Sequence, residues 1–97
     1  MFYFYVLLSR EDNTYYYGST HDLTRRVHEH NTGKVQSTVY RQPLKLLYYE
    51  AYEVMRQARL REKQVKASGS IRKALHERIN PVIRTRGQPG LPQGSRR

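Results

Sequence analysis

Three ionisable side chains occupy positions where the helical repeat calls for apolar residues. Arg26 and His30 share the apolar stripe of a helix expected over about 22–32, and Glu62 interrupts the apolar line of a helix expected over 54–66. Each also has a simple alternative role. Arg26 and His30 could pack their aliphatic or ring atoms at the rim of the core with their polar ends in solvent, and Glu62 could form a surface ion pair. Burying a charge costs several kcal/mol unless it is paired. Together they indicate a polar site against a sheet, built from groups that bind anions, transfer protons and bind cations.

Tyrosines alternate along the two N-terminal segments that are expected to form this sheet. Tyr3 and Tyr5 share one face of the first strand, and Tyr16 takes the opposite face of the second strand from Tyr15 and Tyr17. Tyrosine is a common half-buried residue of sheets, so this run alone does not define a site.

The elements that must position these residues follow from composition and turn chemistry. Gly18 is expected to end the second strand and, because it has no side chain, to allow close backbone approach or an unusual φ. Asp22 or Thr20 is expected to cap the first helix, and Ser70 the last one. The order β-β-α-β-α-α predicts an α+β fold in which a small three-stranded antiparallel sheet is flanked by helices. The expected strands are 3–8, 14–17 and 44–52, and the expected helices are 22–32, 54–66 and 70–79.

The net charge of +10 is confined to one half of the 97 residues. Residues 1–53 carry six basic and six acidic side chains, whereas residues 54–97 carry twelve basic and two acidic ones. This excess favours a polyanionic partner, most simply nucleic acid. The last fourteen residues are rich in arginine, glycine and proline, which predicts a flexible basic tail over 84–97 after a folded domain over 1–83.

Composition excludes several classes of function. The absence of cysteine removes thiolate nucleophiles, cysteine-ligated metals and any disulfide-linked partner through this sequence. No apolar run approaches the ~18 residues of a membrane span, and the first apolar stretch has the wrong flanks for a signal peptide. The expected location is therefore the cytoplasm, with no membrane partner; the sequence leaves the oligomeric state open.

The spacing of the tyrosine segments resembles the paired motif of the GIY-YIG nuclease superfamily. Tyr3-Phe4-Tyr5 is followed after ten residues by Tyr16-Tyr17-Gly18. The segments that follow, 22–31, 41–51 and 61–66, are similar to the small single-domain branch of that superfamily in the same order. The resemblance covers about residues 2–80. It departs from the family pattern at Tyr3 and Phe4, where the first motif has glycine and isoleucine.

The resemblance implies catalytic roles for five residues. Tyr5 matches the tyrosine proposed as general base or as part of the water-activating network, and Tyr16 matches the second motif tyrosine near the scissile phosphate. Arg26 matches the arginine that stabilises charge on the phosphate, and His30 matches a position that assists proton transfer. Glu62 matches the glutamate that holds a single divalent metal, Mg²⁺ or Mn²⁺.

The resemblance also gives expectations about geometry and proton affinity. Gly18 matches a position where the backbone must turn tightly. The pKa of Tyr5 is expected to fall below its usual ~10 under the influence of a metal or a neighbouring cation, and that of His30 to stay near ~6.5.

Two functions are consistent with these patterns. The first is a metal-dependent endonuclease that hydrolyses phosphodiester bonds in nucleic acid, with DNA favoured over RNA. The alternative is a non-catalytic basic module that tracks a phosphate backbone. The candidate nucleic-acid-binding residues are Arg25, Arg59, Arg61, Lys63, Lys66, Arg72 and Lys73.

Overall fold

The computed structural model describes residues 1–79 and confirms the predicted order of elements. The predicted domain end at residue 83 and the tail over 84–97 lie outside the described residues. The elements are β1 (Phe2–Ser9), β2 (Tyr15–Thr20), α1 (Leu23–His30), a short 3-10 helix η1 (Gln36–Thr38), β3 (Leu44–Tyr52), α2 (Met55–Ala67) and α3 (Gly69–Ile79).

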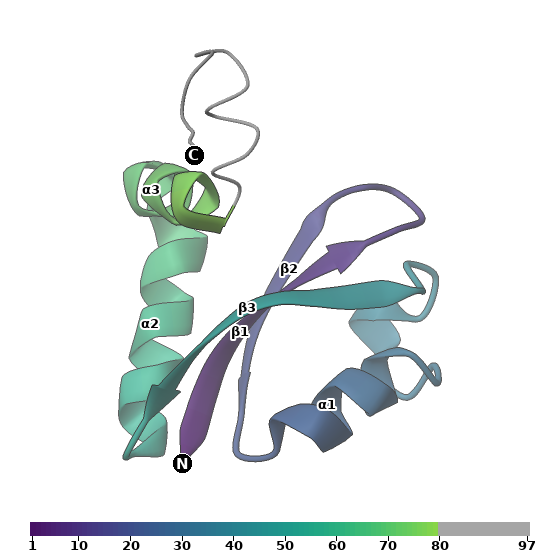
Figure 1. The fold of residues 1–97 in the computed structure, drawn as a ribbon, viewed down its shortest axis with the longest axis horizontal. Helices are drawn as coiled ribbons and strands as arrows, with labels where there is room; N and C mark the ends of the chain where they lie inside the picture. Colours follow the sequence, from purple (N-terminus) through teal and green to yellow (C-terminus); the bar gives the residue numbers. More distant parts are fainter. Residues whose placement is uncertain (80–97) are drawn as a thin grey trace, which may run out of the picture. The chain divides into compact units, whose positions relative to one another are not determined.

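The three strands form one antiparallel sheet in the order β2-β1-β3 (Figure 1). β1 is the central strand, and its residues 4–7 are almost fully buried. In the register, Tyr5 stands opposite Gly18 on one side and opposite Tyr49 on the other. The predicted α+β fold with a three-stranded antiparallel sheet is confirmed.

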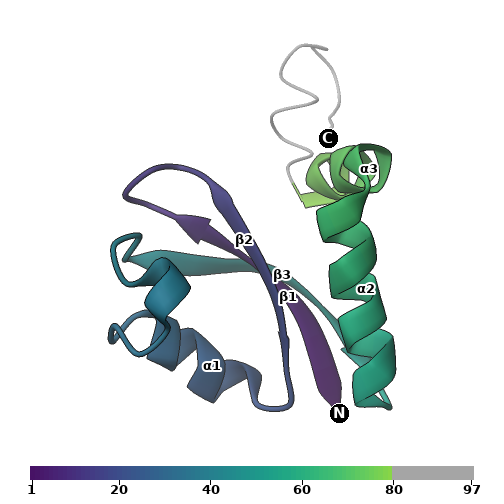
Figure 2. The same ribbon diagram turned by 180° about the vertical axis from the view of Figure 1, so that it is seen from behind.

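The two faces of the sheet carry different helices, as both ribbon views show (Figures 1 and 2). On one face, Leu23 and Val27 of α1 pack against a core cluster of Tyr5, Leu7 and Leu44. α2 packs against β2 and β1 on the other face, where its residues Ala58 and Val65 are buried. The alternation of side chains along β1 therefore divides the molecule into two layers.

An ion pair fixes α2 against β3. The Arg61 guanidinium donates hydrogen bonds to both carboxylate oxygens of Glu50, at 3.0 and 3.2 Å, and lies over the Phe4 ring. Tyr48 and Tyr52 donate their hydroxyl hydrogens to the same carboxylate. Because these donors satisfy a partly buried anion, Arg61 anchors the helix.

The ends of α1 are set by two polar side chains. Asp22 caps the N-terminus by accepting a hydrogen bond from the Arg25 backbone N–H at 3.1 Å, so Asp22 rather than Thr20 is the cap. Asn31 follows the last helical residue, and its side-chain amide exchanges two hydrogen bonds with the Leu44 backbone, at 2.7 and 2.8 Å. The helix therefore ends at His30, two residues earlier than predicted, because Asn31 bonds to the start of β3.

The start of α3 differs from the predicted start of the last helix. The chain divides into two compact units, Met1–Ala67 and a second that begins at Ser68. In the second unit, α3 begins at Gly69, and the hydroxyl of Ser68 accepts a hydrogen bond from the Ile71 backbone N–H at 3.2 Å. Ser68 and not Ser70 is therefore the cap. Among residues 1–79, no helix is both long and apolar enough to cross a membrane.

Candidate active site

The hydroxyl of Tyr5 lies directly over the backbone of Gly18. Tyr5 is 1% exposed, and a Cβ added to Gly18 would stand 2.5 Å from the hydroxyl oxygen. Gly18 lies within β2, which continues to Thr20, so the predictions that this glycine ends the strand and turns the backbone tightly are wrong. The residue leaves room for the tyrosine ring of the neighbouring strand instead.

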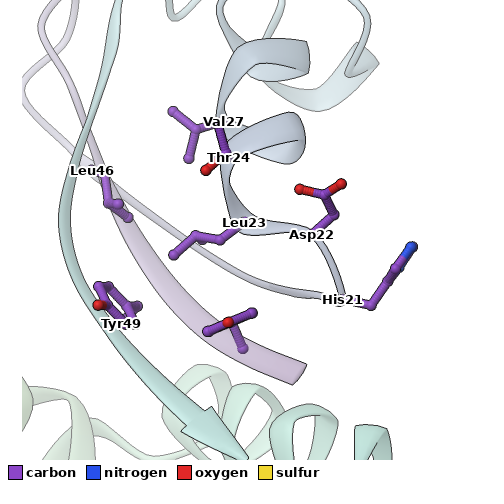
Figure 3. Close-up of a pocket in the computed structure, with 8 residues that line it drawn as sticks. His21, Asp22, Leu23, Thr24, Val27, Leu46 and Tyr49 are labelled. Atoms are coloured by element: carbon purple, nitrogen blue, oxygen red, sulfur yellow. The ribbon is translucent and has the colours of Figure 1, made fainter. Parts of the chain in front are cut away.

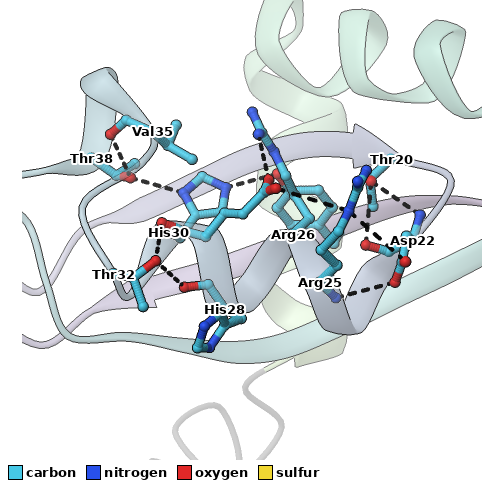
Figure 4. Close-up of polar contacts among 11 residues, drawn as sticks. Thr20, Asp22, Arg25, Arg26, His28, His30, Thr32, Val35 and Thr38 are labelled. Carbon is cyan, nitrogen blue, oxygen red and sulfur yellow. Dashed lines mark hydrogen bonds and ion pairs between the residues drawn. The ribbon is translucent and has the colours of Figure 1, made fainter.

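A chain of buried hydrogen bonds leads away from this hydroxyl. The Tyr5 oxygen lies 2.9 Å from Nε2 of His30, and Nδ1 of His30 lies 2.8 Å from the hydroxyl oxygen of Thr38 (Figure 4). The Thr38 hydroxyl donates in turn to the backbone carbonyl of Val35 at 3.4 Å. His30 and Thr38 are both fully buried, so water does not compete for these bonds.

Burial moves the pKa values of Tyr5 and His30 in opposite directions. It raises the pKa of Tyr5 to about 12, against a lowering contribution from a hydrogen bond with Arg26. Burial, followed by the positive charge of Arg26, lowers the pKa of His30 to about 4. Both shifts differ from the expected lowered value for Tyr5 and ordinary value for His30, because desolvation disfavours the charged form of each group. At neutral pH the pair is a protonated phenol beside a neutral imidazole.

Arg26 places a positive charge between the buried Tyr5–His30 pair and the protein surface. Its guanidinium pairs with Glu29 at 3.0 Å, its charge acts on both Tyr5 and His30, and 36% of its side chain is exposed. The predicted placement of Arg26 and His30 on the sheet-facing side of the helix is thus observed. A guanidinium that is partly open to solvent is suited to bind an oxyanion.

Tyr16 completes the aromatic wall of the cluster. Its ring centroid lies 4.9 Å from that of His30 and 6.4 Å from that of Tyr5. The Arg41 guanidinium lies over the Tyr16 ring, 5.9 Å from its centroid. Arg41 also donates hydrogen bonds to the Tyr15 carbonyl and the Thr14 hydroxyl, so it fixes the β1–β2 hairpin beside the site.

Glu62 approaches the same edge strand from the other helix layer. One of its carboxylate oxygens accepts a hydrogen bond from the Ser19 hydroxyl at 2.6 Å, and the other pairs with the Lys66 ammonium at 2.6 Å. The charge of Glu62 contributes to the raised pKa of Tyr5. Glu62 thus reaches the edge strand β2 from the α2 layer, whereas Tyr5 packs with the α1 layer.

The donors around Glu62 fit a hard cation held by few protein ligands. Within residues 1–79, no group of three or more His, Asp and Glu side chains is arranged to hold a metal. Mg²⁺ is commonly bound through one or two carboxylates together with waters and substrate phosphates. The carboxylate of Glu62 and the neighbouring Ser19 hydroxyl suit that mode of binding, with Lys66 now occupying one carboxylate oxygen.

Comparison with known proteins identifies the family. Residues 1–72 match the family model of the GIY-YIG catalytic domain. The chain belongs to the GIY-YIG family. Members of this family are typically endonucleases.

Named relatives of this GIY-YIG domain are UPF0213 proteins. The chain is 41% identical to one from Listeria welshimeri over 56 residues, which are 57% of this chain and 62% of the relative, so the match spans less than two thirds of that protein. It is 39% identical to one from Pediococcus acidilactici over 87% of this chain and 88% of the relative. The solution NMR structure of a UPF0213 protein from Bacillus halodurans has a TM-score of 0.46 at 27% identity, with 92% of this chain and 89% of that chain covered.

The predicted nucleic-acid-binding residues of the GIY-YIG domain fall into three groups. Arg59, Lys63 and Lys66 line a surface pocket of about 480 Å³ together with Glu62. Arg61 and Arg25 are instead paired with carboxylates. The Arg61 guanidinium pairs with Glu50, and that of Arg25 lies 3.8 to 3.9 Å from the carboxylates of Glu29 and Asp22. The remaining two, Arg72 and Lys73, lie on α3 in the second unit.

A separate pocket of about 610 Å³ opens between α1 and the sheet (Figure 3). Neither Tyr5, Arg26 nor His30 lines it. Its walls are aliphatic and tyrosine side chains, with polar groups from the start of α1. The lining residues are Tyr3, His21, Asp22, Leu23, Thr24, Val27, Leu46 and Tyr49.

Sequence reasoning missed Thr38, Ser19 and Arg41. Thr38 belongs to the segment predicted as a polar loop, and no periodicity marks it as buried. Ser19 contacts Glu62 because α2 packs on β2, and Arg41 contacts the Tyr16 ring because the loop before β3 returns to β2. Their signal is tertiary and is absent from local sequence patterns.

Proposed function

We propose that this GIY-YIG domain is a metal-dependent endonuclease that hydrolyses phosphodiester bonds in nucleic acid, with DNA preferred over RNA. The observation that supports this most is the surroundings of one hydroxyl. Tyr5 lies between the neutral imidazole of His30 and the guanidinium of Arg26, in the electrostatic field of Glu62. The cytoplasm, where nucleic acid is accessible, is the proposed location.

Arg26 is proposed to bind the scissile phosphate. Its guanidinium carries several N–H donors on a plane, and its pair with Glu29 leaves part of the side chain exposed. Negative charge grows on the phosphate oxygens as water attacks, and a fixed cation stabilises that charge more than it stabilises the ground state. The Tyr16 ring packs edge-on against the His30 ring and covers one side of it.

Tyr5 and His30 are proposed to accept the proton of the attacking water as a unit. The water oxygen forms a bond to phosphorus while the ester bond to the leaving oxygen breaks. The water proton passes to the Tyr5 oxygen as the Tyr5 proton passes to Nε2 of His30, and the leaving oxygen takes a proton from solvent. This route avoids a free phenolate, which the pKa of about 12 at Tyr5 disfavours.

The anionic substrate is expected to assist this transfer. The positive charge of Arg26 is the second cause of the low pKa of His30. A phosphate bound at Arg26 neutralises that charge, so the imidazole becomes a better proton acceptor when substrate is present.

Glu62 is the residue proposed to hold the divalent metal, Mg²⁺ or Mn²⁺, with the Ser19 hydroxyl beside it. Such a cation, when bound, supplies Lewis-acid stabilisation of phosphate and leaving oxygen. Lys66 must then release the carboxylate. Arg59 and Lys63, which line the same pocket, are proposed to pair with neighbouring phosphates.

A cleavage assay separates this proposal from a non-catalytic binding module. The purified chain is incubated with double-stranded, single-stranded and branched DNA and with RNA, in Mg²⁺, Mn²⁺ or EDTA. We expect metal-dependent products that Glu62→Gln and Arg26→Ala reduce by about a hundredfold or more. Lys45→Ala, an exposed change on β3, serves as the matched control.

The same variants define the contrary result. Equal cleavage by Glu62→Gln or Arg26→Ala contradicts the assignment of the site. Binding that depends steeply on salt, survives Glu62→Gln and yields no product supports the binding module instead.

A further inference from the structure

Thr38 lies at the inner end of the hydrogen-bond chain that begins at the Tyr5 hydroxyl. It lies in η1, outside the paired tyrosine motif and outside both helices that carry the other site residues. Its hydroxyl contacts one side-chain atom, Nδ1 of His30 at 2.8 Å, and one backbone atom, the Val35 carbonyl oxygen at 3.4 Å. The residue is fully buried, so water does not replace either partner.

The Val35 end of this chain determines its direction. A carbonyl oxygen only accepts hydrogen bonds, and a hydroxyl group has a single hydrogen to donate. The Thr38 hydroxyl gives that hydrogen to the Val35 carbonyl, so its oxygen accepts from Nδ1–H of His30. The neutral imidazole then has its lone pair on Nε2, and the Tyr5 hydroxyl donates to it.

The opposite direction leaves groups unsatisfied. If Thr38 donated to Nδ1, the single hydrogen of the neutral imidazole would sit on Nε2 and point at the Tyr5 oxygen. The Tyr5 hydrogen would then lose the imidazole as its acceptor, and the Val35 carbonyl would lose the Thr38 hydrogen. An unsatisfied buried polar group is costly, so the first direction is favoured.

We propose that Thr38 is a positioning residue that holds His30 with its hydrogen on Nδ1, so that the lone pair of Nε2 faces the Tyr5 hydroxyl. The imidazole is thereby ready to receive the proton that Tyr5 releases. When it does, the imidazolium keeps its Nδ1–H bond to the Thr38 oxygen, which accepts more strongly from a cation. The effect on rate rests on the proposed nuclease function, whereas the tautomer is a property of the protein without substrate.

The tautomer is measured directly by long-range ¹H–¹⁵N NMR of the histidine rings, with the His30 signals assigned by their loss in His30→Gln. We expect the wild-type protein at neutral pH to carry the hydrogen on Nδ1. Thr38→Val has nearly the same shape but no hydroxyl, so Nδ1–H loses its acceptor and the hydrogen moves to Nε2. Thr38→Ser retains the hydroxyl and is expected to retain the wild-type tautomer.

Cleavage kinetics supply the second readout. Thr38→Val is expected to lower kcat by about tenfold or more with little change in KM, because Nε2 then donates to Tyr5 instead of accepting from it. Thr38→Ser restores kcat. Thr32→Val is the matched control, since the Thr32 hydroxyl is exposed and donates only to backbone carbonyls at the end of α1.

The results separate this proposal from the proposed function. A wild-type hydrogen on Nε2, or an unchanged tautomer in Thr38→Val, overturns the positioning role whether or not the protein cleaves nucleic acid. A changed tautomer with unchanged kcat overturns the link to catalysis. Absence of cleavage by wild-type protein refutes the nuclease and leaves the tautomer to decide the role of Thr38. Thr38→Ala replaces the valine variant if amide spectra show that the latter is unfolded.

Discussion

Tyr5 and Gly18 face each other across β1 and β2, and the tyrosine hydroxyl fills the space that a side chain at Gly18 would need. The glycine is therefore required by the tyrosine. This relationship explains why a glycine stands inside a strand, where it otherwise weakens pairing.

Gly18→Ala is expected to destabilise the fold and disturb the site together. The added Cβ would lie 2.5 Å from the Tyr5 hydroxyl oxygen and 2.6 Å from its Cζ, so the ring or the strand must shift from its present position. Overpacking of this kind costs about 1–3 kcal/mol, measured by urea unfolding. Gly69→Ala is the control, because its Cβ meets only a flexible Arg72 side chain at 3.7 Å. A Gly18→Ala protein as stable as wild type contradicts this packing.

Stability is expected to fall as pH drops through the range below the ordinary pKa of histidine. The folded state holds the pKa of His30 at about 4, through burial and then the charge of Arg26, whereas the unfolded state has the usual 6.5. Between these values the unfolded state binds more protons, so stability is fully present above pH 6.5 and is lost toward pH 4. The contribution is of the order of 3 kcal/mol.

The pH dependence is tested by urea unfolding of wild type and His30→Gln from pH 7 to pH 4.5. Glutamine has no proton to gain, so the variant is expected to show a flatter dependence over this range. Parallel curves for the two proteins would show that His30 is not the group responsible.

Arg61 and Lys63 are expected to differ although both are basic residues of α2. Arg61→Ala leaves the carboxylate of Glu50 without its cation and is expected to cost about 1–3 kcal/mol of stability, measured by urea unfolding. Lys63→Ala is expected to leave stability within about 0.5 kcal/mol and to weaken nucleic-acid binding with a smaller salt slope. If Arg61→Ala were as stable as wild type while Lys63→Ala was destabilised, the ion pair between Arg61 and Glu50 would have no structural role.

Asn31 is expected to be a stability residue that acts on the position of α1. Asn31→Ala removes both hydrogen bonds to the Leu44 backbone, which leaves two buried backbone groups unsatisfied at a cost of about 1–3 kcal/mol each. Asn31→Asp keeps an acceptor for the Leu44 N–H and places a second acceptor against its carbonyl, so it is expected to rescue only in part. Thermal unfolding measures both, with exposed Gln36→Ala as the control. Wild-type stability in Asn31→Ala would show that these bonds do not hold the helix.

Local sequence patterns determined the elements and the faces they present. The aromatic and β-branched residues of 3–8 predict a strand, and the helical repeat directs Arg26 and His30 toward the sheet. These features depend on neighbours within a few residues, so periodicity predicts them. The resemblance to the GIY-YIG family, carried by the spacing of Tyr5 and Tyr16, is confirmed by the family match.

Tertiary structure decided what each group does to the next. The lowered pKa of His30 and the raised pKa of Tyr5 are caused first by burial. The Thr38 acceptor and the pairing of Arg61 with Glu50 join residues eight or more positions apart that share no local pattern. Desolvation and hydrogen-bond partnership are properties of packed layers, since each depends on what excludes water from the group. The sequence by itself thus determined which residues gather near the sheet, and only the packed structure determined their protonation and their partners.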